Sequence, residues 1–458
     1  MAGGVSLGSP AYIQSYFLKF ARSVTYFTQP WTIAANIQTY GDKFGEMAMT
    51  AELSPPPRRG TLVEQHWEPR MDALGGRAAR RGFTFEAYVP TSIADQSFLL
   101  DSEIAAAAAN AEAACRELND EPPEFGNFET LARQLLRAES VASSRIEGLI
   151  LSHRRLAKAD FSGTHDMTAQ SVLANIRALE RAVDLAGSVE TLERGHLEEV
   201  HRILFEGTRD EARGGQIRTG QNWIGGPTSG PSDAEFVPPP PELVAALVDD
   251  LCEFCNRVDL PTAIQAGIAH AQFETIHPFF DGNGRVGRAL ILIVLRRRGL
   301  ARSFLPPVSL VLAGEADRYV AGLGSWRRGD EDDWYRVFID ALYRAAGGAR
   351  DFAADVAGLQ KRWLAKAGEP RRGSGPRRLI ELLPSHPIVD VKTATDLLGG
   401  TPERARQAIA RLEQAGVVRQ TSAGRRNRAW ESVGLFDLLD SFERDLGPAG
   451  RTPRPTNP

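Results

Sequence analysis

The chain contains the stretch His277-Pro-Phe-Phe-Asp-Gly-Asn-Gly-Arg-Val-Gly-Arg288, which combines the features of a phosphate site with a candidate base. Gly282, Asn283 and Gly284 tolerate backbone angles that are closed to most residues, so successive N–H groups can turn toward one anion. The apolar run that begins at Ala289 predicts a buried helix starting near Asn283. The N-terminus of that helix would add N–H donors and a positive dipole end at the same place. The stretch therefore predicts a site for a nucleotide triphosphate.

Charged and titratable side chains around this loop supply the chemistry. Arg285 and Arg288 are three apart on the first helical turn, so both can reach the far end of bound phosphates. Asp281 stands at the edge of the loop, where a carboxylate among phosphates is a typical Mg²⁺ ligand. His277 precedes the loop and can accept a proton near neutral pH. The alternative is a Gly-Asn turn before a core helix with two surface arginines.

The same stretch resembles, without departure, the signature HPFx[D/E]GNGRxxR of the Fic family. The resemblance implies a mainly α fold, with a Fic helical core and a β-hairpin flap. It also implies a protein adenylyltransferase, which transfers AMP from ATP to a Ser, Thr or Tyr hydroxyl of a target protein or of itself. His277 would be the catalytic base, Asp281 would hold Mg²⁺, and Phe279 would point into the core. ATP would be bound by Gly282, Asn283, Gly284, Arg285 and Arg288.

A second local pattern resembles the inhibitory motif [S/T]xxxE[G/N] of Fic proteins, filled here by Ser143, Glu147 and Gly148. In the family the glutamate pairs with the second arginine of the signature, which is Arg288 in this chain. Such a carboxylate would form a strong bidentate pair and occupy the place of the γ-phosphate. A Ser and a Glu four apart also occur on many solvated helices, which is the alternative. The resemblance implies an enzyme that Glu147 holds inactive.

Between residues 214 and 241 the helical pattern stops, and alternating and turn residues predict a β-hairpin. Fic proteins carry a flap at this place, which holds the target segment in extended form beside the histidine. The target-docking residues would be Ile217, Arg218 and Thr219, and a plain surface hairpin is the alternative. Because strand pairing reads the target backbone, the site would tolerate many sequences, and the target protein cannot be named.

Helical periodicity predicts further helices over residues 101–118, 128–146, 171–186, 192–205, 241–258, 262–276, 315–323 and 332–345. We divide them into an N-terminal helical region with the inhibitory helix (83–190) and the Fic core (191–365). Residues 1–82 are expected to be a disordered leader or a wrongly assigned start, because Met47 and Met49 offer later starts. Residues 447–458 are expected to form a disordered tail.

Residues 376–446 follow a glycine-rich linker and predict three short helices and two strands, the layout of a small winged helix. Basic residues outnumber acidic ones here, which is compatible with DNA as a partner. Binding to a protein or to a sister subunit, and so a homodimer, is the alternative. The DNA model places Thr401, Arg404 and Gln407 in the major groove and Arg425, Arg426 and Arg428 along the phosphates.

The composition is that of a globular protein with several domains: 458 residues, 42% hydrophobic, 24% charged, with a net charge of -4. Three cysteines make no disulfide framework, so a cytoplasmic location is expected. Cys252 and Cys255 are expected to be buried helix residues rather than a zinc or redox pair, and His270 a structural histidine. No apolar run is long enough to cross a membrane.

Two other functions are compatible with the same residues. One keeps the site and changes its chemistry, to removal of AMP with Glu147 positioning a water, or to another nucleotide donor. The other is a transcription regulator whose Fic core senses a nucleotide. The complete signature favours an enzyme over an inactive site.

Overall fold

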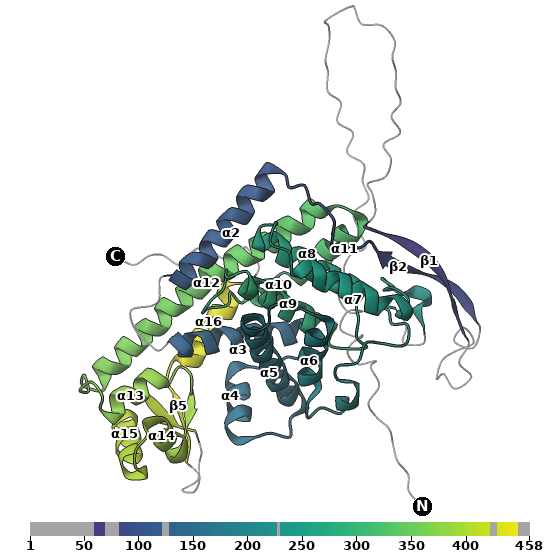
Figure 1. Cartoon of the computed structure of the whole chain (residues 1–458). Coiled ribbons are helices and arrows are strands. Elements are labelled where there is room, and N and C mark those ends of the chain that lie inside the picture. The colour runs from purple at the N-terminus through teal and green to yellow at the C-terminus, as the bar shows by residue number, and fades with distance from the viewer. Residues whose placement is uncertain (1–58, 69–81, 121–127, 227–229, 422–427, 448–458) are drawn as a thin grey trace, which may run out of the picture.

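The computed structural model describes residues 59–68, 82–120, 128–226, 230–421 and 428–447, and most of them are helical (Figure 1). Two small antiparallel sheets accompany the helices, one of β1 and β2 and one with the order β3-β5-β4. The mainly α fold expected from the sequence is therefore confirmed. In the described part of the chain, every helix is too short or too polar to cross a membrane.

The N-terminal sheet is a ribbon that projects from one end of the helical body (Figure 1). Strand β1 (Gly60–Trp67) pairs with β2 (Phe83–Pro90), in register from Gly60 opposite Pro90 to Trp67 opposite Phe83. The prediction of disorder over residues 1–82 is therefore wrong for β1. A lone strand has no helical periodicity, and its partner lies beyond a glycine- and arginine-rich stretch. Residues 1–58 and 69–81, on which the rest of that prediction falls, lie outside the described residues.

The helical body is built around two buried helices, α8 (Thr262–Ile276) and α9 (Asn283–Arg297). Every residue of α8 is buried, because other helices cover it on all sides. The surrounding helices are α2 (Ser102–Asp120), α3 (Phe128–Ile146), α4 (His153–Ser162), α5 (Met167–Ser188), α6 (Arg194–Phe205), α7 (Pro241–Cys255), α10 (Val308–Gly314), α11 (Ala316–Arg328) and α12 (Glu331–Lys366). The predicted helices are all present, whereas α4 and α10 were not predicted.

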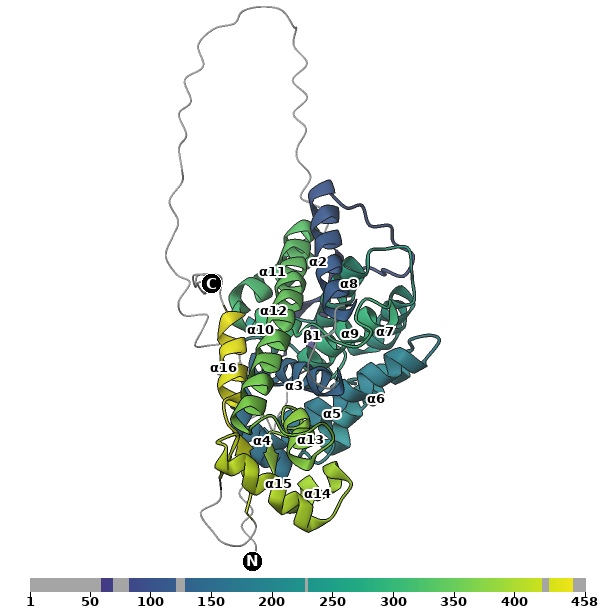
Figure 2. The ribbon, with the colours of Figure 1, turned by 90° about the vertical axis from the view of Figure 1, so that its left-hand side faces the viewer.

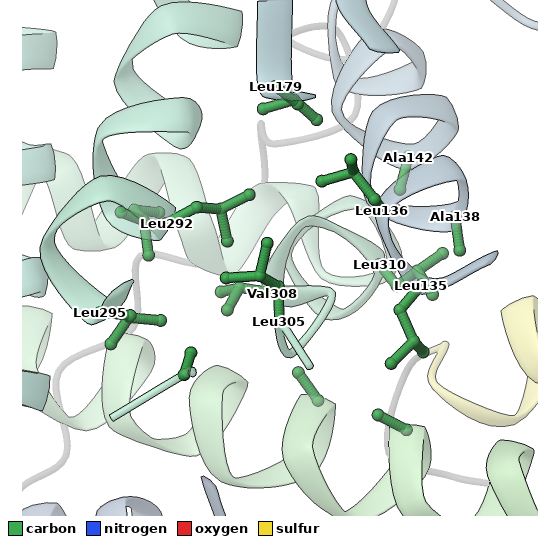
Figure 3. Close-up of a cluster of buried hydrophobic side chains, with 14 of the residues drawn as sticks. Leu135, Leu136, Ala138, Ala142, Leu179, Leu292, Leu295, Leu305, Val308 and Leu310 are labelled. Atoms are coloured by element: carbon green, nitrogen blue, oxygen red, sulfur yellow. The ribbon is translucent and has the colours of Figure 1, made fainter. Parts of the chain in front are cut away.

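Figure 3 shows how α3, α5, α9 and α10 share one apolar cluster. Leu135 and Leu136 from α3 meet Leu292 from α9 and Leu310 from α10, and all four side chains are buried. This cluster fixes the distance between α3 and α9. The two helices carry the residues of the candidate site, so the core holds them in place.

Helix α12 runs to Lys366, although the sequence pattern predicted its end near residue 345. The pair Gly347 and Gly348 resembles a helix stop, yet both lie inside the helix. A Cβ at Gly348 would collide with the side chain of Leu446, so this glycine allows the C-terminal segment to approach closely. The contact with Leu446 therefore explains why a glycine stands at this position inside the helix, and the predicted end near residue 345 is wrong.

The C-terminal unit, defined here as α13 to α16, follows a short loop after α12. Its elements are α13 (Gly375–Leu382), β3 (Ile388–Val389), α14 (Val391–Leu398), α15 (Pro402–Gln414), β4 (Val418–Gln420), β5 (Trp430–Ser432) and α16 (Leu435–Asp445). The three helices before β4 and the two strands β4 and β5 lie where the sequence predicted them, whereas α16 was not predicted. Helix α16 lies along α12 (Figure 2), where Phe442 stacks on Phe352 with ring centroids 4.5 Å apart.

The predicted β-hairpin flap is reduced to one antiparallel bridge, between Ile224 and Phe236, in the described residues 214–226 and 230–240. A short 3-10 turn, η3 (Glu211–Arg213), precedes the bridge, and a second, η4 (Pro231–Asp233), lies between the two bridged residues. Two regular strands do not form because Gly225 and Gly226 adopt positive φ angles and the proline run 238–241 cannot donate ladder hydrogen bonds.

The close contact of α8 with α12 gives a test of this packing. A Cβ at Gly267 would lie 2.9 Å from Cδ1 of the buried Phe338, so Gly267→Ala should lower the free energy of unfolding by about 1–3 kcal/mol. Gly347→Ala is the control, because a Cβ there meets nothing within 4 Å. It should be neutral or stabilise by about 0.5–1 kcal/mol. Urea unfolding measures both changes, and equal midpoints for the two variants would contradict the packing described.

Candidate active site

His277 ends α8 in the left-handed conformation, with a φ of 50°. A residue with a side chain rarely adopts this conformation, so the surrounding structure must hold it. The amide of His277 donates to the carbonyl of Phe273, and its own carbonyl accepts from Nε of Arg218 at 2.9 Å and from Nδ2 of Asn222 at 3.3 Å. The flap segment therefore fixes the turn that presents the histidine.

The side chain of Arg218 is bound inside the fold, and docking of a target at this residue stays a prediction. Its side chain is only 1% exposed, and it also donates to the carbonyls of Gly220, Pro239 and Ile276. Its backbone N–H donates to Pro278, so this amide is not available for strand pairing either. The arginine holds the start of the motif loop, which we define as residues 277–282 between α8 and α9.

The other two predicted docking residues differ from Arg218. Ile217 is half-buried and packs against the main core, whereas Thr219 is exposed. Docking of a target at these residues stays a prediction.

The side chain of Asn283 closes the motif loop. Its Oδ1 accepts from the amide of Phe279 at 2.8 Å, and its Nδ2 donates to the carbonyl of the same residue at 2.7 Å. Only its backbone N–H, at the first position of α9, is oriented by the helix toward an anion. Gly282 precedes it with a φ of 76°, and a Cβ there would collide with Leu204 and Phe205. Both residues are thus required by the turn itself.

His201 of α6 contacts the motif loop through Phe279 and Asp281. This role was not predicted from the sequence. Its ring stacks on Phe279, with centroids 3.8 Å apart and planes 3° apart. Its Nδ1 accepts from the amide of Gly215, so its Nε2 carries the proton that is donated to the carbonyl of Asp281 at 3.0 Å. Burial lowers the pKa of His201 to about 4. A single histidine on an amphipathic helix gives no sequence signal for such a role.

The ring of His277 is kept neutral. Burial and the charges of Arg218 and Arg327 lower the pKa of His277 to about 3, while 19% of its side-chain surface stays exposed. Its Nδ1 lies 3.9 Å from Oε2 of Glu274, a second buried residue that sequence analysis missed. Burial raises the pKa of Glu274 to about 7. The histidine is therefore free to accept a proton at physiological pH.

The two signature arginines are both buried, so the interpretation as surface arginines is wrong. Arg288 donates from Nε to Oγ of Ser143 at 2.9 Å, and from Nη2 to the carbonyl of Ser143 and to Oε1 of Glu147, both at 2.8 Å. Arg285 donates to Oγ of Ser171 at 3.1 Å. The contact between Glu147 and Arg288 expected from the resemblance is therefore present, but through one hydrogen bond, from Nη2 to Oε1, rather than as the bidentate pair expected.

Gly148 ends helix α3 with a φ of 80°. Its amide donates to the carbonyl of Arg145, and the amide of Leu149 donates to that of Ser144, which is the pattern of a Schellman motif. The glycine is required because this motif needs the left-handed conformation. Glu147 consequently sits at the C-terminal end of a helix, where the dipole disfavours a carboxylate.

The carboxylate of Glu147 instead lies against the first turn of α9. A Cβ at Gly284 would collide with its Oε1, so the glycine leaves room for the carboxylate beside the helix N-terminus. Backbone N–H groups and the helix dipole favour an anion at this position. The carboxylate of Glu147 thus lies where the sequence predicted an anion site.

Asp281 has the surroundings that a Mg²⁺ ligand needs. One carboxylate oxygen accepts from the amide of Gly282 at 2.7 Å, and the other lies 3.9 Å from Nη2 of Arg285. The side chain is 47% exposed, so the second oxygen can be reached. Mg²⁺ commonly uses one or two carboxylates together with substrate phosphates and waters. The donor set therefore fits a metal that arrives with a nucleotide.

Several residues considered from the sequence are structural. His270 is buried, with its Nε2 2.8 Å from Oη of Tyr319. Cys252 and Cys255 are buried and unpaired, and burial raises the pKa of both thiols. All of them belong to the packing around α8, as the sequence predicted.

The predicted DNA contacts of the C-terminal unit are exposed where the structure describes them. Thr401, Arg404 and Gln407 lie on the open face of α15, and Arg428 is exposed before β5. Arg425 and Arg426 lie outside the described residues. Binding of DNA stays a prediction.

In this structure the motif loop and the N-terminus of α9 lie next to the neutral ring of His277, and α3 and α5 contact α9. This arrangement is typical of a protein that binds an anion beside a histidine base. Residues 191–295 match the family model "Fic/DOC family", and residues 105–184 match "Fic/DOC family N-terminal". These two stretches of the chain are therefore similar to the Fic/DOC family.

Several known proteins are similar in sequence to parts of this chain. It is 33% identical over 136 residues to "Protein adenylyltransferase fic-1" of Caenorhabditis elegans, which covers 28% of this chain and 24% of that one. It is 43% identical over 68 residues to a "Probable protein adenylyltransferase" of Aquifex aeolicus, covering 15% and 21%. The chain thus matches about a quarter of the length of these curated relatives. A solved Fic family protein from Desulfovibrio desulfuricans is 21% identical, with a TM-score of 0.45, and covers 74% of this chain and 98% of that one.

The role of Arg218 can be tested by removal. Arg218→Ala would remove the donor to the carbonyls of Ile276, His277 and Pro239, of which that of His277 would keep the longer bond from Asn222. It should lower the free energy of unfolding by roughly 2–4 kcal/mol. Arg213→Ala is the control, because Arg213 is exposed and should change stability by less than about 0.5 kcal/mol. Chemical denaturation compares the two. An Arg218→Ala protein as stable as the control would contradict the assignment.

The buried histidines make stability depend on pH. Burial lowers the pKa of His201 to about 4 and that of His270 to about 3, whereas both return to about 6.5 on unfolding. The unfolded chain therefore binds more protons below pH 6.5, so stability is complete above that pH and is lost as the pH falls toward 4. Between pH 7 and pH 5 each histidine should cost about 2 kcal/mol. Burial raises the pKa of Glu274 to about 7, so this carboxyl group acts in the opposite direction over the same pH range. Denaturant titrations should therefore compare the wild type with a His270→Gln variant, and an equal pH dependence of the two proteins would be inconsistent with a neutral buried ring.

Proposed function

We propose that this chain is a protein adenylyltransferase, which transfers AMP from ATP to a Ser, Thr or Tyr hydroxyl of a target protein or of itself, and that Glu147 holds it inactive. One observation carries the proposal: the carboxylate of Glu147 is bound to Arg288 against the first turn of α9. An anion of the chain thus fills the site that the phosphates of ATP would need. The names of the curated relatives support the same activity.

The N-terminus of α9 is the phosphate site in this proposal. Backbone N–H groups of Asn283 and Gly284 point outward from the first turn, where no helical acceptor exists for them. Arg285 and Arg288 provide two buried guanidinium groups beside this turn. Bound here, the β- and γ-phosphates of ATP would meet both the helix end and the arginines, which together orient the α-phosphorus.

His277 is the general base. Its neutral ring accepts the proton of the target hydroxyl, and the hydroxyl oxygen attacks the α-phosphorus of ATP while pyrophosphate leaves. Arg218 and Asn222 hold the carbonyl of His277, so the ring is positioned before the substrate arrives.

Asp281 would hold Mg²⁺ through its accessible carboxylate oxygen. When bound with ATP, the ion neutralises charge on the phosphates as the leaving group departs. Asp281 is suited to this because its other oxygen is already fixed by the amide of Gly282.

Inhibition follows from competition for Arg288. A carboxylate and a γ-phosphate cannot both take the same guanidinium edge, so ATP would bind in a pose unsuited to transfer while Glu147 is in place. Two features make the carboxylate displaceable: it lies at the unfavourable end of α3, and 23% of its side chain is exposed.

Self-labelling with α-labelled ATP and Mg²⁺ tests the proposal. Glu147→Gly should raise the rate strongly, because Arg288 becomes available to the γ-phosphate. Adding His277→Ala to Glu147→Gly should then lower the rate by roughly two to four orders of magnitude while ATP remains bound. ATP binding, measured by calorimetry, shows that the second variant still has its substrate site.

Other outcomes separate the alternatives. If Glu147→Gly binds ATP but labels no better than the wild type, inhibition by Glu147 is wrong. If the same substitution stops the release of AMP from a labelled substrate, Glu147 positions a water and the enzyme removes AMP. Full activity of the His277→Ala form would exclude the histidine as the base.

A further inference from the structure

The segment that carries Glu147 is held on both sides by one residue of the C-terminal unit. On one side, Nη2 of Arg145 donates to Oε2 of Glu443 at 2.9 Å and lies 2.8 Å from Oε1. On the other side, Nε2 of His153, the first residue of α4, lies 3.5 Å from Oε1 of the same carboxylate. Glu443 lies in α16, so this helix contacts the residues on both sides of Glu147, Arg145 and His153.

The surroundings of Glu443 make this contact strong. Its side chain is largely buried, and burial alone would raise its pKa. Hydrogen bonds and charges from His153 and Arg145 outweigh burial and keep the pKa below its ordinary value. The group is therefore an anion at physiological pH. Removing a partner from a buried charge is strongly destabilising, so the structure favours keeping Arg145 and His153 in place.

A second set of contacts joins the same regions. Nε of Arg154 lies 3.5 Å from Oε2 of Glu431 in β5, and its guanidinium group lies 5.2 Å from the ring centroid of Phe436 in α16. At the other end of α3, Oγ1 of Thr130 and Oγ of Ser385 are 2.6 Å apart. The C-terminal unit thus contacts α3 at its beginning and its end, and α4 at its beginning.

The backbone connects these contacts to Glu147. The carbonyl of Arg145 accepts the hydrogen bond of Gly148, which closes the last turn of α3, and Glu147 lies inside this turn. A displacement of Arg145 would therefore move the turn that places the carboxylate on Arg288. Neither Arg145 nor Glu443 contacts Arg288 itself, so both act through the position of Glu147.

We infer that the C-terminal unit positions Glu147 on Arg288 through the contact of Glu443 with Arg145 and His153, so that displacement of α16 releases the inhibition. The inference rests on the proposed inhibition by Glu147 and adds its regulation. Any ligand that binds the C-terminal unit better with α16 displaced would activate the enzyme, because it would shift the population toward the released state. Arg145 and Glu443 are positioning residues.

The experiment uses the full chain with α-labelled ATP and Mg²⁺. Glu443→Gln keeps the shape of the side chain and removes its charge, and it should raise self-labelling about fivefold or more, which is at the lower end of typical coupling between sites. The matched control is Asp440→Asn, the same change at an exposed acid of α16, which should label like the wild type. Combining Arg145→Glu with Glu443→Arg restores the opposite charges and should lower labelling again.

A double variant distinguishes positioning of Glu147 from a general effect on folding. In a Glu147→Gly background, Glu443→Gln should change labelling by less than about twofold, because there is no inhibitory carboxylate left to release. Hydrogen exchange gives a readout that does not depend on activity: the amides of Gly148 and Leu149 should exchange faster in Glu443→Gln, because their bonds to Arg145 and Ser144 open more often.

The outcomes separate this inference from the proposed function. If Glu147→Gly is activated but Glu443→Gln labels and exchanges like the wild type, the positioning role of Glu443 is wrong and the inhibition stands. If Glu443→Gln raises labelling equally in the Glu147→Gly background, its effect does not pass through Glu147, and the inference is overturned. If Glu147→Gly is itself not activated, the proposed inhibition fails, and this inference fails with it.

Discussion

One buried guanidinium group, that of Arg288, connects the two parts of the chain that make the site. It donates to Ser143 in the last turns of α3 and to Glu147 directly after this helix. A buried charge without partners would cost several kcal/mol, so the position of α3 and the position of α9 depend on each other. The carboxylate of Glu147 also connects two helix ends, because its backbone follows the negative C-terminal end of α3 while its side chain lies at the positive N-terminal end of α9. The proposed inhibition and the packing of α3 against α9 thus depend on the same contact.

Much of the site could be predicted because its signal is local. The motif from His277 to Arg288 carries the turn, the helix start and the charges within one short run, and the boundaries of α8 and α9 followed from it. Gly148 could also be read locally as a helix end. The pairing of Glu147 with Arg288, 141 residues apart, followed only from the resemblance, because no spacing rule connects such distant positions.

The residues that were missed or misread act through partners that the sequence does not show together. His201 and Glu274 are single titratable residues on helices, and each gains its role from what lies across from it. Arg218 looked like an exposed flap residue because its neighbours are polar, yet four backbone carbonyls surround it. The end predicted for α12 near residue 345 was too early, and the contact that accommodates Gly348, with Leu446, lies almost a hundred positions later. In each case long-range packing overrode a correct local rule.

The contact of Arg145 with Glu443 joins residues 298 positions apart, and this has a consequence for protein synthesis. On the ribosome the whole signature, up to Arg288, emerges well before Glu443 has been added. At about 5–20 residues per second, the interval is on the order of ten seconds or more. If the proposed regulation holds, a nascent chain has the complete motif from His277 to Arg288 before α16 is available to position Glu147. Because translation runs from the N-terminus to the C-terminus, the contact between Arg145 and Glu443 forms after the signature has been synthesised.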